Sequence, residues 1–117
     1  MIVVIFRAKL KLIDEDFEKT GQRMRDIAES RYGCVGVTSF QQNNEELTLT
    51  YWESAEDIAA WRRDPEHIMA QRIGAEKWYE WYVIQVATID RAYHSAILPD
   101  TEKFGHLSLG KKRDPDS

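Results

Sequence analysis

The chain is poor in the residues that build disulfide frameworks and metal clusters. It contains one cysteine, Cys34, among 117 residues, which excludes an intrachain disulfide and any zinc site made of several cysteines. No histidine or lysine lies near Cys34 in the sequence, so we expect a small buried residue rather than a reactive thiol. The three histidines, His67, His94 and His106, are scattered, and we expect no metal site.

Excess basic charge, long apolar runs and glycine-rich loops are also missing. The formal net charge of -4 and the pI near 5.4 argue against a nucleic-acid partner. The apolar run from Ile2 to Phe6 is short and is followed by Arg7, Lys9 and Lys11, which predicts neither a signal peptide nor a membrane span. No phosphate-cradling glycine loop, flavin or nicotinamide fingerprint, or nucleophile-base motif is present. We therefore expect one cytoplasmic domain with no membrane partner.

Alternation of apolar and polar residues predicts four strands, and spacing and capping residues predict three helices. Ser54 followed by Asp57 is an acidic variant of the N-terminal capping pattern, and Pro65 disfavours helical geometry at the residue before it. Gly33 and Gly74 are expected to end helices. The expected strands are Ile2–Leu12, Cys34–Gln41, Leu47–Trp52 and Tyr82–Tyr93, and the expected helices are Asp14–Ser30, Ser54–Arg63 and Pro65–Gly74, with Ala75–Tyr79 as a turn.

The order β-α-β-β-α-β, with the last helix broken at Pro65, predicts an α+β, ferredoxin-like split βαβ fold, with helices on one face of a four-stranded antiparallel sheet. Apolar residues on both faces of the first and last strands indicate that the second face of the sheet is buried too. A homodimer forming an α+β barrel would bury it. We expect this domain at residues 1–93, and at 94–117 an extension docked on the dimer through Ile97, Leu98, Phe104, Leu107 and Leu109.

The stretch from Tyr51 to Tyr82 holds all four tryptophans and predicts a pocket, because two short helices do not need so many large rings to bury an apolar face. Trp61 and His67 flank the break at Pro65, and one interpretation is that both side chains point into a cavity between the helices and the sheet. The alternative is that Trp61 packs in the core and His67 is a satisfied or exposed helix residue.

Arg7 lies in the middle of the first strand, on the face that carries Val3 and Ile5. Its guanidinium is suited to meet an anionic or phenolate oxygen in the mouth of the barrel. A salt bridge to the partner subunit fits the same position equally well.

Three sequence passages together resemble the antibiotic biosynthesis monooxygenase (ABM) domain family: YWESAEDIAAW, RRDPEHIMAQRIG and WYEWYVIQVATIDRAY. The resemblance covers Ile2 to Tyr93. It implies a ferredoxin-like fold paired into a dimeric barrel. For some members it also implies cofactor-free oxygenation of phenolic polyketides to quinones, assisted by pocket Trp, Asn, Tyr and His residues.

On this resemblance, His67 is expected to act as base or hydrogen-bond donor, with Trp61 beside it in the catalytic site. Substrate-binding positions are expected at Tyr51, Trp52, Gln71, Arg7 and Phe6. The heme-degrading branch of the family is similar, but its histidine ligand position falls on Gln71, and an amide is a poor iron ligand.

Two functions follow as hypotheses. The first is a cofactor-independent monooxygenase acting on an electron-rich aromatic or phenolic small molecule, in which the protein positions and desolvates the substrate anion. The second is a non-catalytic dimer that binds a small aromatic ligand or has a structural role only.

Overall fold

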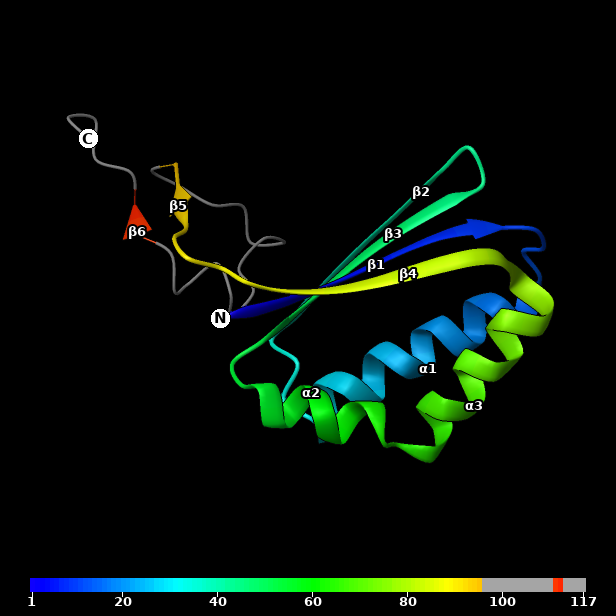
Figure 1. The fold of residues 1–117 in the computed structure, drawn as a ribbon, viewed down its shortest axis with the longest axis horizontal. Helices are drawn as coiled ribbons and strands as arrows, with labels where there is room; N and C mark the ends of the chain where they lie inside the picture. The colour runs from blue at the N-terminus through cyan, green and yellow to red at the C-terminus, as the bar shows by residue number, and fades with distance from the viewer. Residues whose placement is uncertain (96–110, 113–117) are drawn as a thin grey trace.

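The computed structural model describes residues 1–95 and 111–112. Its elements follow the chain in the order strand, helix, two strands, broken helix, strand (Figure 1). They are β1 (Ile2–Leu10), α1 (Glu15–Arg31), β2 (Gly36–Gln42), β3 (Glu45–Trp52), α2 (Ala55–Arg62), α3 (Pro65–Ile73), the π-helix η1 (Gly74–Trp78), β4 (Tyr79–Thr88), and the two-residue strands β5 (Tyr93–His94) and β6 (Lys111–Lys112).

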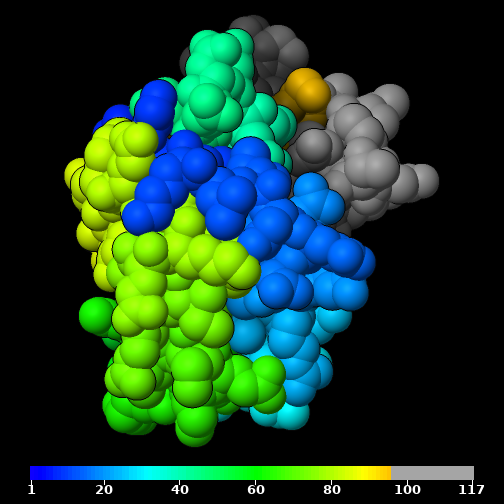
Figure 2. Space-filling view, turned by 90° about the vertical axis from the view of Figure 1, so that its right-hand side faces the viewer, coloured from blue at the N-terminus to red at the C-terminus, as the bar shows by residue number. Residues whose placement is uncertain are grey.

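The first four strands form one antiparallel sheet in the order β2-β3-β1-β4. All three α-helices cover the same face of this sheet (Figure 1), and α1 and α3 lie side by side when the molecule is viewed from the end at which η1 meets β4 (Figure 2). The predicted α+β ferredoxin-like fold is confirmed. The five apolar residues predicted to dock the tail lie outside the described residues: Ile97, Leu98, Phe104, Leu107 and Leu109.

Local sequence signals set most of the helix ends. Asp14 caps α1 by accepting a hydrogen bond of 2.8 Å from the Phe17 amide, and Ser54 caps α2 by accepting one of 3.2 Å from the Asp57 amide. Pro65 occupies the first turn of α3, where its missing N–H costs nothing. Beyond α1, Gly33 has a φ of 75°, the left-handed conformation that glycine adopts without strain.

The hairpin between β2 and β3 is tighter than the predicted strand ends at Gln41 and Leu47 imply. Asn43 and Asn44 alone connect the strands, with φ of 55° and 63°. Two successive positive φ values give the turn twist that matches the twist of paired strands, and asparagine tolerates this conformation.

The α-helix ends beside Gly74 as predicted, at Ile73, but the turn predicted after it is wrong. Gly74 has helical φ and ψ of -59° and -45°, and the chain continues as the π-helix η1. The reason for glycine here is close packing, because a Cβ on Gly74 would lie 2.7 Å from Cε2 of Tyr79. The predicted turn at Ala75–Tyr79 is therefore mostly helix, and the last strand begins at Tyr79 rather than Tyr82.

The last strand also ends earlier than predicted, at Thr88 rather than Tyr93. Thr88 pairs with Ile2, and the Ile89 amide donates to the Met1 carbonyl at 2.9 Å. The pairing of β4 with β1 ends at this point.

The core between the helices and the sheet is split into two clusters. One contains Ala28, Cys34, Trp52 and Ile58, and the other contains Leu10, Phe17 and Trp78. Cys34 is buried, as predicted, and its thiol donates to the Gly36 carbonyl. Burial raises the pKa of the Cys34 thiol, which fits a packing role.

Candidate functional site

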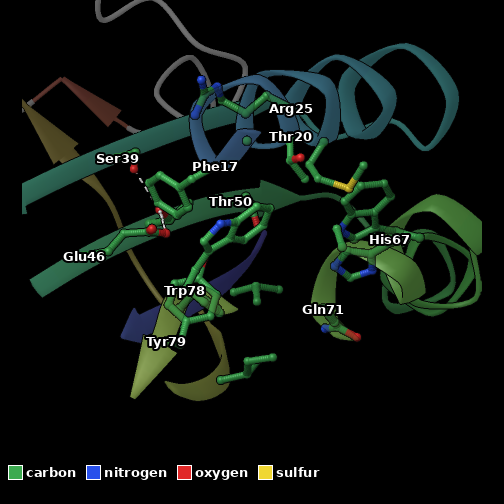
Figure 3. Close-up of a pocket in the computed structure, with 18 of the residues that line it drawn as sticks. Phe17, Thr20, Arg25, Ser39, Glu46, Thr50, His67, Gln71, Trp78 and Tyr79 are labelled. Carbon is green, nitrogen blue, oxygen red and sulfur yellow. Dashed lines mark hydrogen bonds between the residues drawn. The ribbon is translucent and has the colours of Figure 1, made fainter. Parts of the chain in front are cut away.

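A cavity of about 510 Å³ lies between the helices and the helix-facing side of the sheet (Figure 3). It touches both core clusters, since Ile58 of one and Phe17 and Trp78 of the other line its wall. Much of the remaining wall is apolar, and its volume is in the range of small-molecule sites. Its apolar and aromatic lining residues are Val4, Phe6, Phe17, Met24, Ile58, Trp61, Ala70, Trp78, Tyr79, Ile84 and Val86.

Trp61 and His67 form a stacked pair at one side of this cavity. Their ring centroids are 4.1 Å apart and their planes are 16° apart. Trp61 comes from α2 and His67 from α3, so the break at Pro65 brings the two rings face to face. Both residues line the cavity.

Burial sets the electrostatics of His67. Desolvation lowers the pKa of the imidazole below its ordinary value of 6.5, while a hydrogen bond with the Trp61 backbone and the charge of Asp64 oppose this change. Nδ1 of His67 is buried, and no described residue makes a hydrogen bond with it. His67 is therefore neutral at pH 7, the state in which an imidazole can accept a proton.

Asp64 holds the start of α3 in place. It is 4 % exposed, and its carboxylate accepts hydrogen bonds from the amides of Glu66 (2.8 Å) and His67 (3.2 Å) and from the Tyr32 hydroxyl (2.6 Å). The Tyr32 hydrogen bond is the main cause of the lowered pKa of Asp64. Because one carboxylate caps α3 and binds α1, it fixes the backbone that carries His67.

An ion pair also attaches α3 to α1. The Arg23 guanidinium donates two hydrogen bonds, of 2.9 and 3.0 Å, to the Glu66 carboxylate. Such a two-point pair fixes orientation better than a single contact, although both partners are about half exposed and the pair stabilises the fold only modestly.

Several polar side chains line the cavity on the side opposite His67, around Glu46 (Figure 3). The Thr48 hydroxyl donates to Oε2 of Glu46 at 2.9 Å, and the Ser39 and Thr48 hydroxyl oxygens are 2.8 Å apart. Burial raises the pKa of Glu46, against the opposing effects of Thr48, Arg25 and Tyr79. Burial, and next the nearby Glu46 charge, raises the pKa of Tyr79, so Tyr79 stays a protonated hydrogen-bond donor.

Four of the predicted site residues come together in the cavity wall: Phe6, Trp61, His67 and Gln71. Trp52 lies apart from them. Its side chain is fully buried in the core cluster with Ile58, and its indole N–H donates to the Thr50 hydroxyl at 2.8 Å. Trp52 supports the wall through its neighbours and is not part of the cavity lining.

Arg7 and Tyr51 lie on the other face of the sheet. Val3 pairs with Tyr51, and Arg7 pairs with Leu47 on one side and Val83 on the other. Side chains alternate along a strand, so these positions face away from Phe6 and the helices. Arg7 lines a separate hollow of about 390 Å³ with Phe40 and Trp81, and it is not brought together with His67.

The sequence reasoning missed the polar residues of the cavity wall. Glu46, Thr48 and Thr50 alternate along β3 on the same face as buried Trp52. Polar residues at three successive helix-facing positions are unusual in a core and are the signal that would have located this side of the cavity. Arg25 and Tyr79 carried no comparable signal, because each belongs to an element with mixed faces.

The described residues, 1–95 and 111–112, contain no group of three or more His, Cys, Asp or Glu side chains placed to hold a metal ion. No helix in the same part of the chain is long and apolar enough to span a membrane.

Comparison with solved structures identifies the class of domain. The fold matches that of SnoaB, a cofactor-independent oxygenase from Streptomyces nogalater, with a TM-score of 0.67 and 12% identity over 78% of this chain and 94% of that chain. It also matches a "putative antibiotic biosynthesis monooxygenase" from Nitrosomonas europaea, with a TM-score of 0.65 and 15% identity over 76% of this chain and 98% of that chain. The chain has an ABM-like domain.

A sequence relative places the chain more closely. It is 35% identical over 89 residues to YqjZ of Bacillus subtilis (strain 168), a protein described as uncharacterized, and the match covers 75% of this chain and 78% of YqjZ. The chain belongs to the same protein family as YqjZ. No protein-family model matches it.

Proposed function

We propose that the chain is a cofactor-independent monooxygenase that oxidises an electron-rich aromatic or phenolic small molecule. The observation that supports this most is the stacked pair of Trp61 and His67 on a largely apolar cavity, with Nδ1 of His67 buried and unpartnered among the described residues. The structural likeness to SnoaB, a cofactor-independent oxygenase, agrees with it.

In the proposed reaction the substrate itself supplies the electrons. Neutral His67 removes an acidic proton from a phenol or an anthrone-type ring, and the resulting anion transfers electrons to dioxygen. For an anthrone, a ring CH₂ becomes C=O, one oxygen atom enters the product, and the other leaves as water with both hydrogens. Trp61 and the aromatic wall hold the ring flat and exclude water, and Gln71 offers a polar contact.

The experiment is an oxygen-electrode measurement with a hydroxylated anthrone, corrected for its spontaneous oxidation. Oxygen uptake that scales with protein concentration and yields the quinone supports the proposal. Binding without uptake, detected by quenching of tryptophan fluorescence, would instead support a non-catalytic ligand-binding protein of the same fold.

We also propose that the chain is a homodimer, paired through the sheet face that the helices leave bare. Phe40, Leu47, Arg7 and Val83 form one row across all four strands of that face. Phe40 is 64% exposed, and Leu47, Val83 and nearby Trp81 are also exposed. So many exposed large apolar side chains on one face indicate a protein–protein contact.

A further inference from the structure

The cavity has a second polar side that the proposed chemistry at His67 does not use. Figure 3 shows Glu46 and His67 on opposite sides of the pocket, with Trp78 between them. Glu46, Thr48 and Ser39 come from the adjacent strands β2 and β3, and Tyr79 is the first residue of β4. A ligand that fills the cavity would therefore meet His67 at one end and Glu46 at the other.

The hydroxyl groups around Glu46 are directed toward it. Thr48 uses its single hydroxyl hydrogen to donate to Glu46, so Ser39 must be the donor in the pair of hydroxyls 2.8 Å apart. Tyr79 also acts as a donor toward the same carboxyl group. A carboxylate has about four acceptor sites, so Glu46 retains capacity to accept a hydrogen bond from a ligand.

We propose that Glu46, together with Thr48 and Tyr79, forms a specificity site that binds a neutral hydroxyl group of the ligand at the end of the cavity opposite His67. The inference rests on the proposed function only in taking the ligand to be an aromatic molecule. It adds that the molecule carries a hydroxyl group remote from its reacting position.

A hydroxyl fits this site better than the other common polar groups. Glu46 and the Arg25 guanidinium line the same cavity and carry opposite charges, so a charged ligand group that is attracted to one of them would be repelled by the other. A ring carbonyl has no hydrogen to donate. A hydroxyl can donate to Glu46, and it carries no charge into a largely apolar cavity.

The test compares the binding of anthraquinone and its 2-hydroxy derivative, which are not substrates for the proposed oxygenation. Dissociation constants are measured by quenching of tryptophan fluorescence, since Trp61 and Trp78 line the cavity. The parent protein is expected to bind the hydroxylated probe roughly tenfold more tightly, the usual size of a hydrogen bond to a charged group. In Glu46→Leu this preference should disappear.

Glu45→Leu is the matched control, because Glu45 is the neighbouring carboxylate on the opposite face of β3 and lies outside the cavity lining. It should keep the tenfold preference. If Glu46→Leu fails to fold, Glu46→Gln, which keeps the side-chain volume, should weaken the preference to about threefold or less, as expected for a neutral acceptor.

Three results would overturn the proposal: equal binding of the two probes by the parent, an unchanged preference in the Glu46 variants, or no binding of either probe up to its solubility. A clear hydroxyl preference without any oxygen uptake would leave this specificity site standing and remove the monooxygenase function. Oxygen uptake without a hydroxyl preference would support the monooxygenase function and remove the specificity site.

Discussion

The rings of Trp61 and His67 stack 4.1 Å apart although they belong to two different helices, on either side of a proline break. On a continuous helix, side chains six positions apart would differ in direction by about 120° and in height by about 9 Å, so they could not stack face to face. The break at Asp64 and Pro65 therefore creates the pair, and the contacts of Asp64 maintain it.

The first prediction concerns the contact between Tyr32 and Asp64. Tyr32→Phe removes the hydrogen bond that does most to lower the pKa of Asp64. A carboxylate whose folded pKa is lowered stabilises the protein above its ordinary pKa and loses that effect as the pH falls through the lowered value. The Tyr32→Phe protein should thus melt at a lower temperature than the parent at pH 7, and the difference in melting temperature should narrow below about pH 4. A difference that does not depend on pH would contradict this role of Tyr32.

The second prediction concerns the titration of His67. Its folded pKa lies below the ordinary 6.5, so the unfolded chain binds more protons as the pH falls below that value, and stability declines. His67→Gln should make the decline in unfolding free energy between pH 7 and pH 5 shallower. NMR titration of the His67 ring should give a midpoint below 6.5, and a midpoint above it would show the sign to be wrong.

The third prediction compares two glycines. Gly74→Ala should destabilise the protein by about 1–3 kcal/mol, the usual cost of overpacking, because its Cβ would lie 2.7 Å from the Tyr79 ring. Gly21→Ala, in α1, meets no atom closer than 3.9 Å and should stabilise by about 0.5–1 kcal/mol through helix propensity. Urea unfolding of both variants measures the difference, and two stabilising substitutions would refute the packing account of Gly74.

The fourth prediction concerns assembly. Trp81 is 42% exposed on the bare face of the sheet, beside the hollow lined by Arg7. The parent should be a dimer at micromolar concentration by light scattering, burying more than the roughly 1,200 Å² typical of weak contacts. Trp81→Glu should shift it toward monomer without unfolding it. A monomeric parent protein would contradict the proposed dimeric α+β barrel.

Much of the fold could be predicted because its signals are local. Ser54 as a cap and Pro65 in a first turn each act on the residues beside them, and both features were located correctly. The role of Gly74 was not predicted, because it depends on Tyr79. The Tyr79 ring, at the start of the next strand, packs against Gly74. The sequence shows the glycine but not the ring that packs on it.

The candidate site was predicted on its helical side and at Phe6 of β1, but not along β3. Trp61, His67 and Gln71 were found because they lie in one aromatic-rich stretch. Glu46 was missed because its place in the cavity depends on which face of β3 meets the helices, and Arg7 was assigned to a site that lies on the opposite face.

The measurement that tests the central claim most directly is oxygen uptake by His67→Ala with a hydroxylated anthrone, beside the parent and His94→Ala. Loss of a general acid-base group should lower turnover by roughly 100-fold or more, with a melting temperature close to that of the parent. His94 lies outside the cavity lining, so His94→Ala should retain full turnover. Unchanged turnover in a folded His67→Ala protein would contradict the account and remove His67 from the mechanism.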